Sequence, residues 1–257
     1  MTDQEVRTAI ESLEDEAASY QQRLQAVWTL QKMGPAAVEA IPALIETLGD
    51  ENATVRKAAA TALGEIGPGQ GIVFALIQAL GDESLDVRRA AAEALCGLEA
   101  EAVGTVPALV QALRDAENAG VRSEIVGVLG RIGPEDGVVP ALIETLLEDK
   151  DPGVRGHAAV MLGGIGPEEG VVPALIQAME DEPNMRWAVT EGLKNMGPAA
   201  AEAVPALIQA LEDECASEIE QVCDVERNAI VRALRAVTGQ DFAEDASAWR
   251  EWWEEQR

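Results

Sequence analysis

The chain is poor in aromatic residues, cysteine and histidine. Only 3% of its 257 residues are aromatic, and it contains three Cys and one His. A single His argues against a metal centre built from several imidazoles, and three Cys are too few for a disulfide framework. The hydrophobic fraction is nevertheless 47%, and it consists mostly of Ala, Leu, Val and Ile. These residues favour helices that pack at short distance.

Positive charge is also scarce. The chain has 19 Lys and Arg against 46 Asp and Glu, which gives a formal net charge of -27. Because nucleic acids and anionic membranes are bound through basic surfaces, we expect neither as a partner. The acidity has two explanations, a basic protein partner and solubility in a saline habitat, and charge alone does not choose between them.

Long apolar segments are missing. No run approaches the roughly 18 apolar residues that suggest a membrane-spanning helix. The first residues, Met-Thr-Asp-Gln-Glu-Val, lack the basic and apolar regions of a signal peptide. We therefore expect a cytoplasmic protein whose thiols stay reduced.

An internal repeat organises the sequence. The motif Pro-Ala-Leu-Ile that begins at Pro42 recurs in related form at residues 74, 107, 140, 173 and 205, about every 33 residues. A second marker, an Arg that usually follows Val, recurs with a similar period. These residues are Arg23, Arg56, Arg88, Arg122, Arg155, Arg186 and Arg227. A period of this length indicates a solenoid of stacked helical units.

Each repeat predicts two helices, A and B. Apolar residues follow the marker Arg at three, seven and ten positions, which lie on one face of helix B. In five repeats a residue that caps helix N-termini stands four positions before the Arg: Ser19, Asn52, Ser84, Asn118 and Asp151. Gly-Pro ends most B helices. The Pro-Ala-Leu-Ile motif marks helix A, and we expect its Pro to kink a helix that begins earlier, as in residues 36–41.

A two-helix unit cannot bury its own apolar face, so neighbouring units must stack. We therefore predict an all-α fold, a right-handed α-solenoid of about seven two-helix repeats that forms a single domain over residues 1–257. Residues 1–35 form the N-terminal repeat and cap, and residues 36–240 the further repeats. Residues 241–257 form a C-terminal Trp-rich capping helix, with Trp249, Trp252 and Trp253 on one side.

The Pro in helix A, the Asp before helix B and the Val-Arg pair inside helix B resemble HEAT repeats. Residues 50–68, DENATVRKAAATALGEIGP, are similar to the HEAT-like repeats of the bacterial phycobilisome-lyase type. The resemblance implies an Arg/Asp ladder along the stack, formed by the seven marker Arg with Asp50, Asp82 and Asp149. Asp115 and Asp181 are one residue out of register with it. The resemblance also implies one functional alternative, a bilin lyase or an assistant that cradles a tetrapyrrole or an apoprotein.

The candidate binding residues lie on helix B at positions one, five and eight after the marker Arg. We call these positions the variable columns, because their residues differ between repeats, and we expect them on the concave side. Trp28 and Trp187 are the predicted anchors, although Trp187 has the alternative of folding onto Met185. The predicted partner-binding residues are Trp28, Lys57, Arg89, Glu93, Ser123, Gly127, Gly156, Val160, Trp187, Glu191, Asn228 and Arg232.

Glycine inside the predicted B helices has three explanations. Gly127, Gly130, Gly156, Gly163 and Gly164 each cost a helix about 1 kcal/mol relative to Ala. They form a trough that a partner enters, they ease close contact between neighbouring B helices, or they reflect neutral drift.

No constellation of catalytic residues emerges. HEAT-type deoxyhypusine hydroxylases hold iron with several His-Glu pairs, whereas this chain has only His157. HEAT-like alkylpurine glycosylases need a basic groove, which the charge opposes. We therefore predict a non-enzymatic scaffold, monomeric and without cofactor, that binds another protein.

One alternative is a metal or iron–sulfur carrier that uses Cys215 and Cys223. Both lie in the acidic segment 211–226, whose spacing matches no zinc signature, and a solvated acidic loop is the simpler interpretation.

Overall fold

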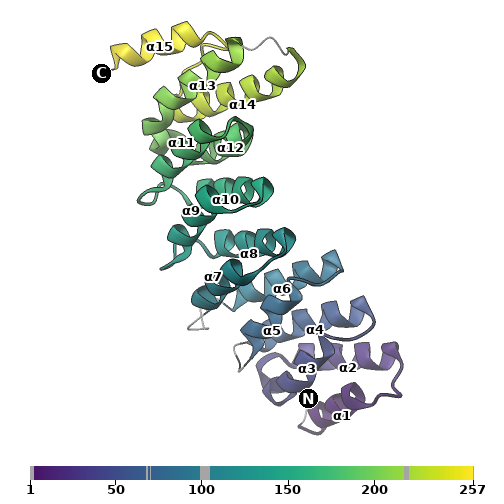
Figure 1. Cartoon of the computed structure of the whole chain (residues 1–257). Coiled ribbons are helices and arrows are strands. Elements are labelled where there is room, and N and C mark those ends of the chain that lie inside the picture. Colours follow the sequence, from purple (N-terminus) through teal and green to yellow (C-terminus); the bar gives the residue numbers. More distant parts are fainter. Residues whose placement is uncertain (1–2, 68, 70, 99–104, 217–219, 257) are drawn as a thin grey trace. The chain divides into compact units, whose positions relative to one another are not determined.

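The described residues are 3–67, 69, 71–98, 105–216 and 220–256 of a computed structural model. They contain helices and turns but no strand, so this part of the chain is an all-α repeat solenoid, as predicted. The chain divides into two compact units, Met1–Ile132 and Gly133–Arg257 (Figure 1). A single domain over the whole length stays a prediction.

In the first unit the helices pair as A and B of successive repeats: α1 with α2, α3 with α4, α5 with α6, and α7 with α8. The elements are α1 (Asp3–Glu14), α2 (Tyr20–Met33), the 3-10 helix η1 (Gly34–Ala40), α3 (Ile41–Thr47), α4 (Ala53–Ile66), α5 (Ile72–Ala79), α6 (Leu85–Gly97), α7 (Thr105–Asp115) and α8 (Ala119–Ile132).

The second unit continues the pattern, with α9 against α10, α11 against α12 and α13 against α14, while α15 packs on α13. Its elements are α9 (Val138–Glu148), α10 (Pro152–Ile165), α11 (Val171–Asp181), η2 (Pro183–Met185), α12 (Arg186–Met196), η3 (Gly197–Ala203), α13 (Val204–Ala216), α14 (Glu220–Thr238) and α15 (Ala246–Glu255).

The B helices begin and end at the predicted residues. Ser19 caps α2 in a reciprocal arrangement with Gln22, and the Asn52 side chain accepts from the Thr54 N–H at 2.9 Å. At the other end, the Gly before Pro ends helix B with a positive φ, for example 53° at Gly34. Glycine reaches this region without steric cost, and Pro cannot continue the helix.

The predicted kink at the helix A Pro is wrong in the second repeat. Residues 34–40 form a 3-10 helix, and the backbone leaves helical geometry at Ala37, with φ -95° and ψ 20°. The α-helix α3 starts afterwards at Ile41, so Pro42 is its second residue. Pro is well suited to this position, because the first-turn N–H groups have no partner inside the helix.

Two of the three predicted core columns are buried in every repeat, whereas position ten is only half-buried at Met33, Ile132 and Ile165. Three residues after each marker Arg, the buried residues are Ala26, Ala59, Ala91, Ile125, Ala158, Val189 and Ile230. Seven residues after it, they are Leu30, Leu63, Leu95, Leu129, Leu162, Leu193 and Leu234. These two columns supply the apolar face that each repeat buries against its neighbours.

The marker Arg of one repeat joins its own B helix to the next repeat. Arg56 Nε donates to Asp82 at 2.7 Å, while Arg56 Nη1 donates to the Asp50 carbonyl at 2.9 Å. Asp82 in turn accepts from the Ser84 N–H at 2.7 Å, in the turn before α6. Arg23 pairs with Asp50 in the same way, at 2.6 Å. Asp50 and Asp82 therefore each bind a backbone N–H of their own turn and the marker Arg of the preceding B helix.

Several later marker Arg residues pair with carboxylates other than the predicted ladder Asp. Arg88 Nε pairs with Glu124 at 3.2 Å, and Asp115, one residue out of register, binds the Gln111 amide instead. Further ion pairs join Arg155 with Glu182, Arg186 with Asp213 and Arg227 with Glu244. Arg122 donates to the carbonyls of Ala116 and Glu117, Asp149 accepts from the Asp151 N–H, and Asp181 is exposed.

Neighbouring B helices approach most closely where two glycines meet. A Cβ on Gly163 of α10 would lie 2.3 Å from the Gly192 Cα of α12, whereas a Cβ on Gly164 would meet nothing within 4 Å. Gly163 is buried and Gly164 is exposed. Close helix packing is therefore the explanation for Gly163, which lines no open trough.

The two ends of the described chain are covered by amphipathic helices. Val6 of α1 is buried where this helix packs on α2 and α3. At the other end Trp249 of α15 is fully buried, its indole donates to the Ala243 carbonyl at 3.0 Å, and Phe242 packs against it edge-to-face. Trp252 and Trp253 are half-buried.

The Asp82 pair makes stability depend on acid pH. Burial alone would raise the pKa of Asp82, but hydrogen bonds from Arg56 and the Ser84 N–H outweigh it and lower this pKa. Its contribution is therefore present above about pH 4, the ordinary Asp range, and is lost as pH falls through the folded-state pKa. We expect Asp82→Asn to lower the free energy of unfolding at pH 7 by about 1–3 kcal/mol and to flatten its fall between pH 5.5 and 3, measured by urea denaturation.

Glu83→Gln is the control, since the Glu83 side chain is 87% exposed although it also reaches Arg56. Equal unfolding free energies for the two variants at pH 7 would contradict the role of Asp82.

Substitution of adjacent glycines tests the close contact of α10 with α12. Gly163→Ala inserts a methyl group against the Gly192 backbone, so we expect it to lower the free energy of unfolding by about 1–3 kcal/mol. Gly164→Ala meets open space in a helix and should raise it by up to about 1 kcal/mol. Urea denaturation of both variants measures the difference, and a stabilising Gly163→Ala would refute this packing.

Candidate partner-binding surface

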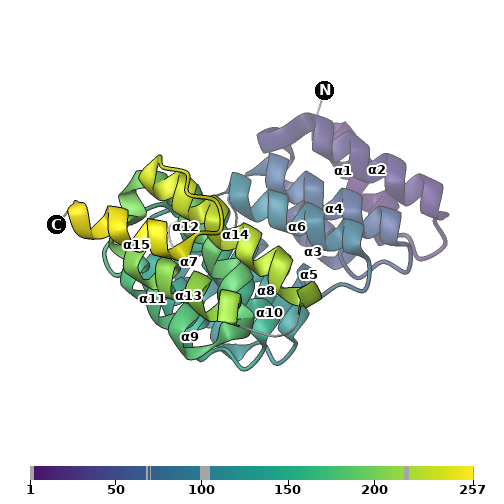
Figure 2. The same cartoon turned by 90° about the horizontal axis from the view of Figure 1, so that it is seen from above.

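The B helices of each unit lie side by side, as Figures 1 and 2 show for α2, α4 and α6. Within each unit, neighbouring B helices pack more extensively than neighbouring A helices do. Closer packing on one side is what the inner side of a curved stack requires. This side of each unit carries the variable columns and is the candidate surface.

The variable columns remain open to solvent at positions one and five. The exposed residues there are Lys57, Arg89, Trp187, Asn228, Trp28, Glu93 and Arg232. The half-buried ones are Leu24, Ser123, Gly156, Thr61, Gly127, Val160 and Glu191. None of these fourteen side chains or glycines belongs to the buried core.

Position eight lies closer to the neighbouring helix. A Cβ on Gly64 of α4 would lie 2.7 Å from the Ala94 Cβ of α6, and Gly163 meets Gly192 in the same way. On a helical wheel this column is nearer to the core face than positions one and five are. The expectation that it faces a groove is therefore wrong at Gly64 and Gly163, where it serves helix packing.

The surface of the second unit centres on Trp187. This side chain is 52% exposed in the first turn of α12, while Met185 is buried. The adjacent Ala188 lies against α10, since a Cβ on Gly156 would be 3.3 Å from the Ala188 Cβ. Trp187 is thus followed by a residue that packs against a half-buried glycine, at a point where the neighbouring helix α10 has no side chain.

Charged residues beside Trp187 are already paired with one another. Glu191 of α12 accepts from Lys194 on the same helix and lies 3.5 Å from Arg232 of α14. Arg232 keeps 52% of its side chain exposed. These ions fix the side chains of α12 and α14 relative to one another next to the exposed indole.

The surface of the first unit centres on Trp28 of α2, which is 46% exposed. Lys57 of α4 pairs with Asp86 of α6 at 3.8 Å, a weak contact between exposed groups. Within the described part of the chain, no carboxylate lies within ion-pairing distance of Arg89. Arg89 and the exposed Glu93 are therefore available to a partner.

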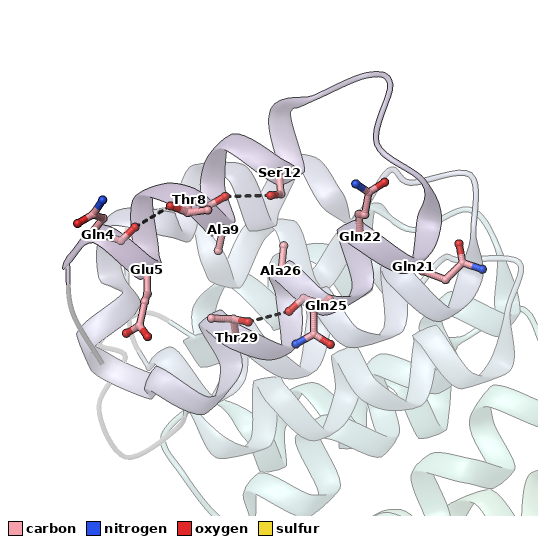
Figure 3. Close-up of a pocket in the computed structure, with 10 residues that line it drawn as sticks. All are labelled: Gln4, Glu5, Thr8, Ala9, Ser12, Gln21, Gln22, Gln25, Ala26 and Thr29. Carbon is pink, nitrogen blue, oxygen red and sulfur yellow. Dashed lines mark hydrogen bonds between the residues drawn. The ribbon is translucent and has the colours of Figure 1, made fainter.

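A hollow of about 630 Å³ lies between α1 and α2. Its walls carry amides and hydroxyls rather than a catalytic set, and the hydroxyls of Thr8, Ser12 and Thr29 bond to carbonyls of their own helices (Figure 3). The lining residues are Gln4, Glu5, Thr8, Ala9, Ser12, Gln21, Gln22, Gln25, Ala26 and Thr29. This hollow therefore belongs to the first repeat alone and brings no catalytic set together.

Metal ligands do not gather in the part of the chain that can be described: no group of three or more His, Cys, Asp or Glu there could hold an ion. The side chains of Cys215 and Cys223 lie outside the described residues. At the edges of segment 211–226, Glu212 pairs with Arg250 and Asp213 with Arg186. None of the described helices is long and apolar enough to span a bilayer.

A family model described as HEAT repeats matches residues 6–72, 73–146 and 139–235. The chain belongs to the HEAT repeat family. The resemblance in the Pro, Asp and Val-Arg positions is thereby confirmed, and the matched ranges include nearly all of the repeats. Comparison with curated protein sequences gives no match.

Similar solved structures include repeat proteins in complexes. One is the complex of CpcE and CpcF of phycocyanin lyase from Nostoc sp. PCC7120, with 22% identity, 96% of this chain and 93% of that chain covered, and a TM-score of 0.43. The karyopherin Kap121p bound to the extreme C-terminus of the protein phosphatase Cdc14p has 16% identity, 98% and 31% coverage, and a TM-score of 0.55. At these identities the likeness concerns the fold.

Proposed function

We propose that this HEAT repeat protein is a non-enzymatic scaffold that binds another protein along the B-helix surface. The exposed indole of Trp187, on a variable column beside Gly156, is the observation that supports this most directly. We further propose a monomer that acts in the cytoplasm without a cofactor.

The position of the exposed tryptophans supports binding on the B helices. Trp28 and Trp187 are each about half exposed, and both lie on variable columns, one in each unit. Exposed Trp is a frequent anchor of protein interfaces, because its large ring becomes buried on binding at little cost in side-chain entropy. The remaining three Trp belong to the C-terminal helix, where Trp249 is buried.

The charges suggest the chemistry of the partner. A net charge of -27 attracts a basic protein and repels acidic ones at long range. On the first unit's surface Glu93 is exposed, so a basic group of the partner can approach its carboxylate. Arg89 supplies a cation that fixes register against a partner carboxylate.

Kap121p supports one form of this proposal. Kap121p has the same fold and, in its solved structure, binds the extreme C-terminus of the protein phosphatase Cdc14p. The open row of B-helix positions in each unit here offers a comparable surface for a segment of a partner.

Capture from a lysate of the source organism, followed by affinity measurement with the captured protein, tests the proposal. We expect Trp187→Ala to raise the dissociation constant by about 30-fold or more, since truncation of a central anchor typically removes at least 2 kcal/mol of binding free energy. Val38→Ala is the matched control, because Val38 is 54% exposed on η1 and belongs to no variable column.

A captured protein that binds both variants as tightly as the unmodified chain would contradict the assignment of this surface. A visible absorbance band that stays with the protein after a bilin is added and the free pigment is removed would instead support the tetrapyrrole alternative that the phycobilisome-lyase resemblance implies.

A further inference from the structure

A groove outside the B-helix surface opens between two A helices of the first unit. It lies between α5 and α7, beside the start of α8, and has a volume of about 580 Å³, within the range of ligand pockets. Its floor is apolar, with Ile77, Ala112, Val121 and Ile125, of which Ile125 is fully buried.

Phe74 stands at the edge of this groove and departs from the repeat. The other occurrences of the helix A motif carry Pro at this position, for example Pro42 and Pro107. Phe74 is 69% exposed, although packing within the repeat does not require a large ring there. It extends the apolar floor toward solvent.

A second departure from the repeat brings carboxylates to the same groove. One extra residue separates Asp115 from Arg122, compared with Asp82 and Arg88. Arg122 therefore donates to the Ala116 carbonyl, as Arg88 does to the Asp82 carbonyl, and Asp115 is displaced from the ladder.

The displaced carboxylate stays at the rim. The Gln111 amide holds Asp115 through both carboxylate oxygens, at 2.9 and 3.0 Å. The second rim carboxylate is Glu117, which is exposed. In the described residues no cation lies within ion-pairing distance of either group. The rim is thus acidic and unneutralised above an apolar floor.

We propose that this groove binds a basic amphipathic segment of a partner protein. An apolar side chain of the segment enters between α5 and α7 against Phe74 and Ala112, and flanking Lys or Arg side chains pair with Asp115 and Glu117. Charge complementarity supports this assignment. So do the two departures from the repeat pattern, at Phe74 and at Asp115, which meet at this groove.

The probe is a fluorescein-labelled helical peptide of Leu and Lys, with Leu at i, i+3, i+4 and i+7, in anisotropy titrations at physiological salt. A peptide with Glu in place of Lys is the matched probe and should not bind. We expect Ala112→Leu, which fills the groove, and the pair Asp115→Asn/Glu117→Gln each to weaken binding of the basic peptide by about tenfold.

Matched controls separate the groove from overall charge. Ala206→Leu places the same side chain on α13, and Glu135→Gln/Asp136→Asn removes the same charge from an exposed turn. Both should leave the dissociation constant within twofold. Circular dichroism melting verifies that each variant is folded.

Equal weakening by the two charge-removing pairs, together with no effect of Ala112→Leu, would overturn the proposal and show attraction by total charge alone. Sedimentation velocity tests the alternative occupant, a second copy of this chain. A dimer that Ala112→Leu dissociates would assign the groove to that second copy and would also overturn the proposal.

Discussion

Each two-helix repeat has an apolar face that only another repeat can bury, and the rest of the structure depends on this constraint. The columns that satisfy it hardly change: every repeat places Leu seven residues after its marker Arg, and each of these Leu side chains is buried. The ion pairs of Arg23 with Asp50 and Arg56 with Asp82 add a polar link between successive repeats. Packing therefore restricts some columns and leaves others to vary.

The parts of the fold that follow from local rules could be predicted from the sequence. Capping by Ser19 and Asn52 and termination at Gly34 depend on a few neighbouring residues, and the buried columns follow from helical periodicity. The exposure of Trp28 and Trp187 follows from the same periodicity, because their positions lie opposite the core face.

Other features depend on distances between helices that spacing does not give. The contact of Gly163 with Gly192 requires the approach of two backbones, which a glycine count cannot separate from an open trough. The partner of Arg88 changed to Glu124 because one extra residue moved Asp115, and the sequence showed the shift but not the new acceptor. The break falls at Ala37 rather than at Pro42 because residues 34–40 form a 3-10 helix. The apolar pattern of such a short helix is hard to distinguish from that of an α-helix.

Freedom from packing leaves the B-helix surface available for the recognition that we propose. It exposes a large ring at Trp187 and a local charge at Arg89, on a molecule whose overall charge is strongly negative. The departures near Phe74 and Asp115 show that A helices also escape the repeat pattern where packing permits. Repetition therefore makes the exceptions informative, because each differs from several equivalents in the same chain.

The most direct measurement is oxidative footprinting of the chain with and without its captured partner, read out by mass spectrometry for individual side chains. The account predicts that Trp28 or Trp187 becomes protected while Phe74, which is 69% exposed on the A helix α5, stays equally reactive. Protection of Phe74 with both tryptophans still oxidised would contradict it.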